Sequence, residues 1–449
     1  MTLRSPFWTM RAAFAAAVAL VGVSATPAAA IDIKEVTSPG GIKAWLVEDH
    51  TIPLIAMQFS FKGGVAAEPE AQRGVTNFLA GMLDEGAGPL DSQAFQSRED
   101  DLAMKLSFDA NLDDFTGSFQ TLSRNRDESF ELLRLALNEP RFDQAPLEKV
   151  RGQIVLGIES DEEDPETIAS NAWMKAAFPD HPYSRTTKGT VESVKTITSA
   201  DLKALSGKLF SRDGLQIAVV GDIKADELAT LLDKTFGKLP ASSGVSEVAE
   251  TQVKRGPLVE IIDRDIPQSV MSFGFGGIKR DDPDFIPAYV MNFILGEGGF
   301  GSRLMEEVRE KRGLTYGIYT SLFPLDRAGA FTGSVSTMNE RAKETLDITR
   351  KEIARMAKDG PTDKELAEAK TYITGSYPLR FDSNRKIASQ LNGIQRQNLG
   401  IDYVNRRNAL VDAVTVDDVK RVAKRILDAD GMIITIVGKP KDVAPQSRT

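Results

Sequence analysis

Two stretches of the chain decide its fold, because one repeats the other. Residues 197–221 read ITSADLKALSGKLFSRDGLQIAVVG, and residues 414–438 read VTVDDVKRVAKRILDADGMIITIVG. They align without a gap at an offset of 217 positions, so that Thr198 matches Thr415. Each stretch begins with a helix-capping threonine, turns at Asp-Gly and ends in a buried strand followed by Val-Gly. The chain is therefore predicted to contain a duplicated structural unit.

A weaker similarity lies nearer the front of each copy. Phe61-Lys-Gly-Gly64 resembles Phe275-Gly-Gly277, and the helices that follow end in the similar strings Met-Leu-Asp-Glu-Gly and Ile-Leu-Gly-Glu-Gly. Strands cluster and helices cluster instead of alternating. This order favours an α+β fold with two tandem similar domains, each a largely antiparallel sheet with helices packed on it. In the first copy we expect strands at 43–47, 55–61, 106–109 and 116–122.

The chain divides into four segments. Residues 1–30 form a signal peptide, 31–239 a first domain, 240–257 a linker and 258–449 a second domain. The linker is rich in Ser, Val, Glu and Lys and has little periodicity, which is typical of a connection between domains.

The first thirty residues have the pattern of a secretory signal peptide. Arg4 and Arg11 supply the positive charge, 12–23 is almost wholly apolar, and Ala28-Ala29-Ala30 offers small residues for cleavage. The apolar run is too short for a membrane span, which needs about 20 residues. We expect cleavage after Ala30 and a periplasmic or secreted protein without a membrane span.

Composition excludes several kinds of chemistry. The 449 residues include no cysteine and only two histidines, His50 and His181, so thiolate nucleophiles, disulfides and Cys-ligated metals are ruled out. The net charge of −9 gives no basic footprint for nucleic acid. Neither a local zinc triad nor a Ser/His/Asp arrangement is recognisable.

A helix predicted over 74–86 resembles a known zinc-binding helix. Val75, Phe78, Leu79 and Met82 share one face, and the frame G-x-x-x-F-L-x-x-M-L is similar to that of the inverted zincins, whose motif is H-x-x-E-H. In that motif two histidines bind zinc and the glutamate activates water. The resemblance is to the pitrilysin and mitochondrial processing peptidase family, and it covers essentially all of 33–440.

When the motif is aligned with this chain, its zinc ligands and its general base are all replaced. Asn77 and Gly81 stand where the histidines belong, Ala80 replaces the general base, and alignment on Asp164-Pro165 places Gly157 at the third ligand. The resemblance thus implies a degenerate zinc site and no metal bound by this chain.

The second copy keeps a string that the family uses. Residues 302–316 closely resemble the family's S-R-L-x-x-x-x-R-E-x-x-G-L-x-Y signature. We expect a helix to Arg312, a stop at Gly313, and a strand from about Leu314 with Tyr316, Ile318 and Thr320 on one face.

On residue chemistry alone, the arginine of this string would pair with Glu306 or Glu310 and the tyrosine would be half-buried. The resemblance implies instead that Arg309 and Tyr316 hold the substrate backbone opposite the zinc. Gly298, Gly299 and Gly301 form either a substrate loop or, more simply, a loop-to-helix turn.

Two functions remain. The first is a non-catalytic, substrate-binding subunit of a heterodimeric zinc metalloendopeptidase, with the zinc in a secreted homologous partner that carries H-x-x-E-H. The second is a peptide-binding or structural scaffold without a peptidase role. Retention of the Arg–Tyr string favours the first, because a scaffold does not need it.

Overall fold

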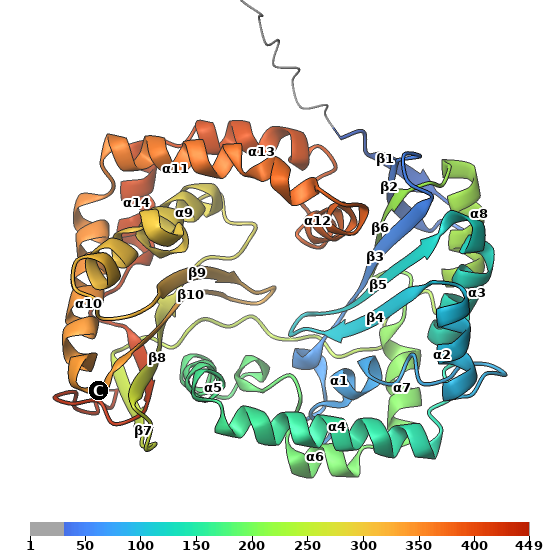
Figure 1. Ribbon diagram of the computed structural model, residues 1–449, viewed down its shortest axis with the longest axis horizontal. Coiled ribbons are helices and arrows are strands. Elements are labelled where there is room, and N and C mark those ends of the chain that lie inside the picture. Colours follow the sequence, from blue (N-terminus) through green and yellow to red (C-terminus); the bar gives the residue numbers. More distant parts are fainter. Residues whose placement is uncertain (1–30, 449) are drawn as a thin grey trace, which may run out of the picture. The chain divides into compact units, whose positions relative to one another are not determined.

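The two β-sheets of the molecule share one strand order (Figure 1). The first sheet has the order β1-β2-β6-β3-β5-β4 and the second β7-β11-β8-β10-β9. If β1 is set aside, strands of equal rank occupy equal places in the two sheets. In each sheet one neighbouring pair is parallel, β2 with β6 and β7 with β11, and the remaining pairs are antiparallel. The predicted α+β fold with duplicated, largely antiparallel sheets is confirmed.

This computed structural model describes residues 31–448. The predicted signal peptide, residues 1–30, lies outside the described residues. No helix within 31–448 is long and apolar enough to cross a membrane. Residues 240–257 form neither helix nor strand, and the domain limits drawn from the sequence remain predictions.

The first half contains six strands and eight α-helices among the described residues. Its strands are β1 Lys34–Thr37, β2 Lys43–Glu48, β3 Leu54–Lys62, β4 Lys105–Ala110, β5 Asp114–Leu122 and β6 Leu215–Gly221. Its helices are α1 Val75–Ala80, α2 Ser92–Asp101, α3 Arg126–Asn138, α4 Gln144–Glu163, α5 Pro165–Ala177, α6 Val191–Thr196, α7 Ser199–Leu209 and α8 Ala225–Phe236.

The second half has the same plan with two π-helical segments added. Its strands are β7 Leu258–Ile262, β8 Gln268–Gly276, β9 Ile318–Pro324, β10 Gly329–Met338 and β11 Ile433–Val437. Its α-helices are α9 Phe285–Asn292, α10 Ala342–Asp359, α11 Asp363–Gly375, α12 Asn384–Arg396, α13 Tyr403–Asp412 and α14 Val416–Ile426. The π-helices are Phe293–Glu297 and Met305–Glu310.

The repeated sequence stretches form matching structures. Thr198 and Thr415 both cap a helix through a capping box, with Asp201 and Asp418 as the reciprocal partners. After the buried strand, the backbone of Gly221 has φ +135° and that of Gly438 has φ +134°. Residues with a side chain rarely adopt this conformation, so glycine ends both repeats for the same physical reason.

Two sequence predictions about local structure were wrong. The helix predicted over 74–86 ends at Ala80, because Met82 and Glu85 bond to carbonyls three residues back and tighten the chain into turns. The strand predicted from Leu314 begins at Ile318. Consequently Tyr316 precedes the strand and lies in solvent, whereas Ile318 and Thr320 are buried.

One helix of each half packs on the sheet of the other half. Helix α5 of the first half packs on β8 and β11, and α12 of the second half packs on β3 and β6. Figure 1 shows both helices beside these sheets. The two helices occupy equivalent places in the repeat, since Pro165–Ala177 and Asn384–Arg396 are offset by 219 positions at both ends. Each sheet therefore has one face covered by its own half and the other face covered partly by the neighbouring half.

A matched pair of hydrogen bonds fixes this exchange. The indole N–H of Trp173 on α5 donates to the carbonyl of Ile433 over 3.3 Å. The amide of Asn392 on α12 donates to the carbonyl of Gln216 over 3.1 Å. Both donors and both acceptors are equivalent positions of the repeat, and buried apolar side chains surround each contact.

Candidate functional site

A cleft of about 910 Å³ lies between α5 and the second sheet. Its walls come from α5, the segment Arg185–Thr187, strands β8, β9 and β10, and the segment Thr315–Gly317. The four β9 residues Tyr319, Thr320, Ser321 and Phe323 belong to the lining. Because β9 pairs only with β10 within residues 31–448, it is an edge strand of the sheet that lines the cleft.

The lining of this cleft is nearly uncharged and combines hydroxyl groups with apolar side chains. Serine, threonine and tyrosine hydroxyls predominate, and Glu166 and Arg185 are the charged lining residues. Arg185 is already paired, because its guanidinium donates to the carbonyl of Glu68 over 2.8 Å and lies 2.7 Å from the Glu70 carboxylate. Such a surface offers many hydrogen-bond donors and acceptors without selecting for one sign of charge.

Tyr316 lines the cleft, and its side chain is 87% exposed. The segment that carries it is held by Thr315, whose hydroxyl oxygen lies 2.7 Å from the Ser336 carbonyl and accepts from the backbone N–H of Gly317. The tyrosine ring itself is therefore presented to solvent from an anchored backbone.

Arg309 lies on the π-helix Met305–Glu310 and not in the lining of the cleft. Its guanidinium carbon lies 4.4 Å from the centroid of the exposed Phe300 ring, and its Nε lies 3.7 Å from the Glu310 carboxylate. Within the described residues no hydrogen bond joins Arg309 to Tyr316. The stacking contact with Phe300 holds the guanidinium while leaving its N–H groups available.

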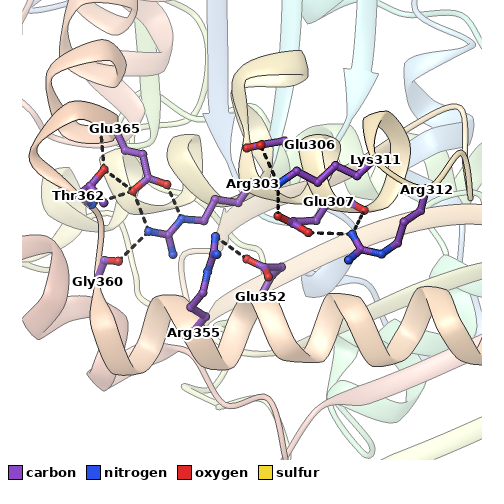
Figure 2. A network of polar contacts seen from close by, with 10 residues as sticks. All are labelled: Arg303, Glu306, Glu307, Lys311, Arg312, Glu352, Arg355, Gly360, Thr362 and Glu365. Atoms are coloured by element: carbon purple, nitrogen blue, oxygen red, sulfur yellow. Dashed lines mark hydrogen bonds and ion pairs between the residues drawn. The ribbon is translucent and has the colours of Figure 1, made fainter.

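An ion-pair network fixes the segment that carries Arg309 (Figure 2). The buried guanidinium of Arg303 donates to both Glu365 oxygens, over 2.6 and 2.8 Å, and to the carbonyl of Gly360 over 2.8 Å. At the other end of the segment, Glu307 accepts from Lys311 over 2.7 Å and from Arg312 over 2.8 Å. Acidic partners thus hold the neighbouring cations, whereas Arg309 has the Phe300 ring and, at 3.7 Å, the Glu310 carboxylate as its neighbours.

The electrostatics of Glu365 reflect this network. Burial acts to raise the pKa of Glu365, but hydrogen bonds from Arg303 and Thr362 outweigh it and lower the pKa to about 2. Thr362 and Glu365 also form the capping box of α11. One carboxylate therefore joins the start of α11 to the base of the π-helix.

The three predicted loop glycines form a short turn. Gly299–Gly301 is one turn of 3-10 helix, and Gly299 has φ +59°. A side chain at Gly298 would approach the carbonyl of Phe293 to 2.7 Å, whereas Gly299 and Gly301 border open space. The glycines thus form a turn between the two π-helices, which agrees with the simpler of the two interpretations drawn from the sequence. The hydroxyl of Ser302 donates a hydrogen bond to the carbonyl of Gly299 in this turn. Nothing in the lining of the cleft comes from these glycines.

The four degenerate zinc positions lie on α1, directly after it and within α4. Asn77 is half-buried, Ala80 is buried, Gly81 follows the end of α1 in solvent, and Gly157 is half-buried on α4. Only the amide of Asn77 could donate a ligand atom, and zinc prefers histidine, cysteine or carboxylate ligands. No cluster of three or more such side chains occurs within residues 31–448. The residues present therefore do not fit a zinc ion.

A lysine that the sequence analysis did not single out lies at this site. The Lys188 ammonium is 2.9 Å from a carboxylate oxygen of Asp161 and 3.3 Å from the carbonyl oxygen of Gly157. Lys188 lies in the loop that begins at His181, and only the structure shows that this loop reaches α4.

Buried Glu68 supports the start of α1 beside this loop. Its carboxylate accepts from the backbone N–H of Gly74 over 2.8 Å and of Thr76 over 2.7 Å. Burial raises the pKa of Glu68 to about 7, although these amides and the Thr76 hydroxyl act in the opposite direction. Isolated in sequence, Glu68 carries no motif that would have revealed this role.

Two family descriptions match the chain, one in each half. "Insulinase (Peptidase family M16)" matches residues 44–191, and "Peptidase M16 inactive domain" matches residues 196–373. A Helicobacter pylori protein named "Non-peptidase homolog YmxG" is 30% identical over 77% of this chain and 79% of its own length. The beta subunit of the mitochondrial-processing peptidase from Blastocladiella emersonii is 23% identical over 89% and 87% of the two chains.

Solved structures give the same result. The crystal structure described as a peptidase M16 inactive domain from Pseudomonas fluorescens superposes with a TM-score of 0.85 at 30% identity, covering 93% of this chain and all of that one. A protease from Helicobacter pylori shares the fold, with a TM-score of 0.82 at 17% identity over 91% of this chain and all of that one.

Proposed function

Because the chain belongs to peptidase family M16, we propose that it is a non-catalytic subunit that presents peptide substrates to a zinc-bearing partner of the same family. One contrast within the chain carries this proposal. The degenerate positions on α1 and α4 offer no zinc ligand set, whereas Arg309 and Tyr316 are held on anchored segments with their polar groups accessible. Names of relatives that read "non-peptidase" and "inactive" support the non-catalytic part.

Arg309 and Tyr316 have the chemistry that peptide hydrolysis requires opposite a metal. Attack on a peptide bond places negative charge on the scissile carbonyl oxygen, and a guanidinium or a phenol can donate hydrogen bonds to it. In the complex these two side chains act on a peptide whose scissile bond lies at the partner's zinc.

The cleft beside β9 is the proposed path of the peptide. An extended peptide pairs with the free backbone groups of an edge strand, so that main-chain hydrogen bonds supply most of its affinity. The hydroxyl-rich, nearly uncharged lining then accepts many side chains. This arrangement suits a subunit that handles peptides of varied sequence.

The partner belongs to the proposal as well. A homodimer of this chain would hold two Arg–Tyr pairs and no metal. We therefore propose a heterodimer with a homologue that carries H-x-x-E-H and its downstream glutamate, in the periplasm or outside the cell. The similarity to a protein named as a processing-peptidase subunit supports such a pairing.

The test is to mix the purified chain with an H-x-x-E-H family member encoded beside it. We expect chelator-sensitive cleavage of peptides that neither chain shows alone, and a stable complex in size-exclusion chromatography. Full activity of the zinc-bearing chain alone, with no gain on mixing, would contradict the proposal.

The roles of the two side chains are tested in the same complex. Arg309→Ala and Tyr316→Phe should each lower turnover by about 10²–10³-fold if the donor acts on the transition state, and should raise the Michaelis constant if it only anchors the peptide. Arg341→Ala and Tyr372→Phe, which alter an exposed arginine and an exposed tyrosine elsewhere, are the matched controls. Unchanged kinetics for both site variants in an assembled complex would exclude these roles.

A scaffold that binds peptides without a peptidase partner is the alternative, and the cleft favours it as much as it favours the first function. The two differ in what the Arg–Tyr pair contributes. A scaffold should bind peptides equally well after Arg309→Ala, and its complexes should show no chelator-sensitive cleavage.

A further inference from the structure

Lys188 reaches the place where the third zinc ligand of the family would begin. A Cβ atom built on Gly157 would lie 3.5 Å from the Lys188 Nζ. The same Nζ lies 2.8–2.9 Å from the two carboxylate oxygens of Asp161, one helical turn further along α4. A glutamate at position 157 would therefore have the Lys188 ammonium beside its Cβ atom.

The backbone of Lys188 ties this contact to α1. A Cβ atom on Gly74, the residue before α1, would approach the Lys188 carbonyl oxygen to 2.3 Å, and one on Gly189 would approach the Arg73 carbonyl oxygen to 2.4 Å. The loop thus crosses the start of α1 in backbone contact, at positions where only glycine fits. Through one residue, α4 is fastened to the helix that carries Asn77 and Ala80.

We propose that the Lys188 ammonium is the fixed cation of the degenerate site: it fastens α4 to α1 in place of a metal, and it excludes a divalent cation from the site. A zinc site joins the same two elements through ligands on each of them. Here the link is made by Asp161, the Gly157 carbonyl and the backbone at Gly74. The inference concerns this chain alone and does not depend on the proposed partner.

Electrostatics explain the exclusion. The Lys188 ammonium lies beside position 157 and is only partly exposed. Solvent and salt therefore screen its repulsion of a divalent cation held by a residue at 157 only incompletely. A new glutamate at 157 would also pair with Lys188 before it could bind a metal. Restoring the four family residues is therefore insufficient while Lys188 remains.

The first test restores the ligands with and without the lysine. One variant carries Asn77→His, Ala80→Glu, Gly81→His and Gly157→Glu, and a second adds Lys188→Met. Zinc content by elemental analysis and zinc affinity by calorimetry are the readouts. We expect the second variant to bind one zinc at least about a hundredfold more tightly than the first. A third variant with Lys195→Met in place of Lys188→Met controls for loss of a lysine from the exposed face of α6.

Equal zinc affinity of the first and second variants would overturn the proposal. If neither restored variant binds zinc, a metal-free cycle decides. Gly157→Glu should leave the melting temperature of the natural chain unchanged or raise it, because the new carboxylate finds Lys188. In a Lys188→Met background it should lower the melting temperature by at least about 2 °C, because the carboxylate then faces Asp161 alone. An identical effect of Gly157→Glu in both backgrounds would overturn the proposal.

Discussion

The two halves of the molecule have the same strand order but differ in the helix that follows the second strand of each repeat. In the first half, α1 ends at Ala80 and passes into tight turns; in the second half, α9 continues into one π-helix and a glycine turn leads to another. The first helix bears the degenerate zinc positions. The π-helices flank the turn beside Arg309, and such insertions are frequent at functional sites.

The difference teaches that the fold does not depend on the residues of the former site. Gly81 is exposed and Gly157 is half-buried, so neither contributes to the core, and only the small side chain of Ala80 packs in it. The sheets are held by the core of each half and by the exchanged helices α5 and α12. The first half could therefore lose its ligands without losing its structure. In the second half one segment is held by the buried guanidinium of Arg303 and its ion pair with Glu365, which indicates that the position of this segment matters.

The largest expected effect is a loss of stability that differs between the two exchanged helices. Trp173→Ala removes a buried aromatic side chain and its hydrogen bond to β11, and should cost about 3–5 kcal/mol of the free energy of unfolding. Asn392→Ala at the matching position should cost about 1–3 kcal/mol, because it leaves one strand carbonyl unpaired. Guanidinium unfolding monitored by circular dichroism measures both. Exposed Leu156→Ala is the control, and separate transitions for the two halves would contradict the expected cooperativity.

The next effect concerns the network of the second half. Arg303→Met leaves Glu365 without its bidentate partner and should destabilise the protein by about 3 kcal/mol. Arg312→Met, in the same segment but more exposed, should cost less than about 1 kcal/mol. Adding Glu365→Leu to Arg303→Met should recover part of the loss. A double variant as unstable as the sum of its parts would show that the pair does not act as a unit.

The repeated glycines provide a smaller and sharper comparison. Both have the same φ, but a Cβ atom on Gly221 would lie 2.1 Å from the Leu54 carbonyl oxygen, whereas one on Gly438 would lie 2.9 Å from that of Gln268. Gly221→Ala should therefore cost more than Gly438→Ala, about 2–3 against about 1–2 kcal/mol. Thermal unfolding of the two variants tests the order, and a larger loss for Gly438→Ala would contradict it.

The smallest expected effects are those of two glutamates, one in each half, whose contributions to stability depend on pH in opposite directions. The pKa of Glu365 falls from 4.5 to about 2 on folding, so its contribution is present above about pH 4.5 and is lost as the pH falls towards 2. The pKa of Glu68 rises from 4.5 to about 7, so its contribution is present below pH 4.5 and is lost as the pH rises towards 7.

Glutamine variants reveal these opposite trends. Relative to the natural chain, Glu68→Gln should gain about 1–2 kcal/mol of stability between pH 4.5 and 7, and Glu365→Gln should lose a similar amount between pH 2 and 4.5. Urea unfolding at several pH values measures both slopes. Parallel pH profiles of the two variants would contradict the assignment.

The fold could be predicted from the sequence wherever local rules decide the structure. The capping threonines, the Asp-Gly turns and the buried strands of the repeat are short-range signals, and they gave the duplication and the sheets. The end of α1 was not predictable from periodicity, because apolar residues continue at helical spacing through Met82, whereas the backbone N–H of Met82 already bonds three residues back instead of four. The exchange of α5 and α12 was hidden as well, since an apolar helix face does not indicate which sheet it covers.

For the candidate site, the sequence could name residues but not their geometry. The motif led to Arg309 and Tyr316, yet it could not show that Phe300 stacks on the arginine or that Tyr316 lies outside the strand. Lys188 was missed because its role arises from contact between segments 31 positions apart in sequence.

The exchanged helices have a consequence for how such a chain could arise. A chain of half the length would fold with one sheet face uncovered, and a second copy of itself would be the natural cover, each copy lending a helix to the other about a two-fold axis. Joining two copies through a linker makes this exchange intramolecular, so that it no longer depends on protein concentration. It also removes the requirement that the two copies have the same sequence. From then on a substitution in one copy need not appear in the other, which is the condition under which one half can lose a metal site while the other keeps its arginine and tyrosine.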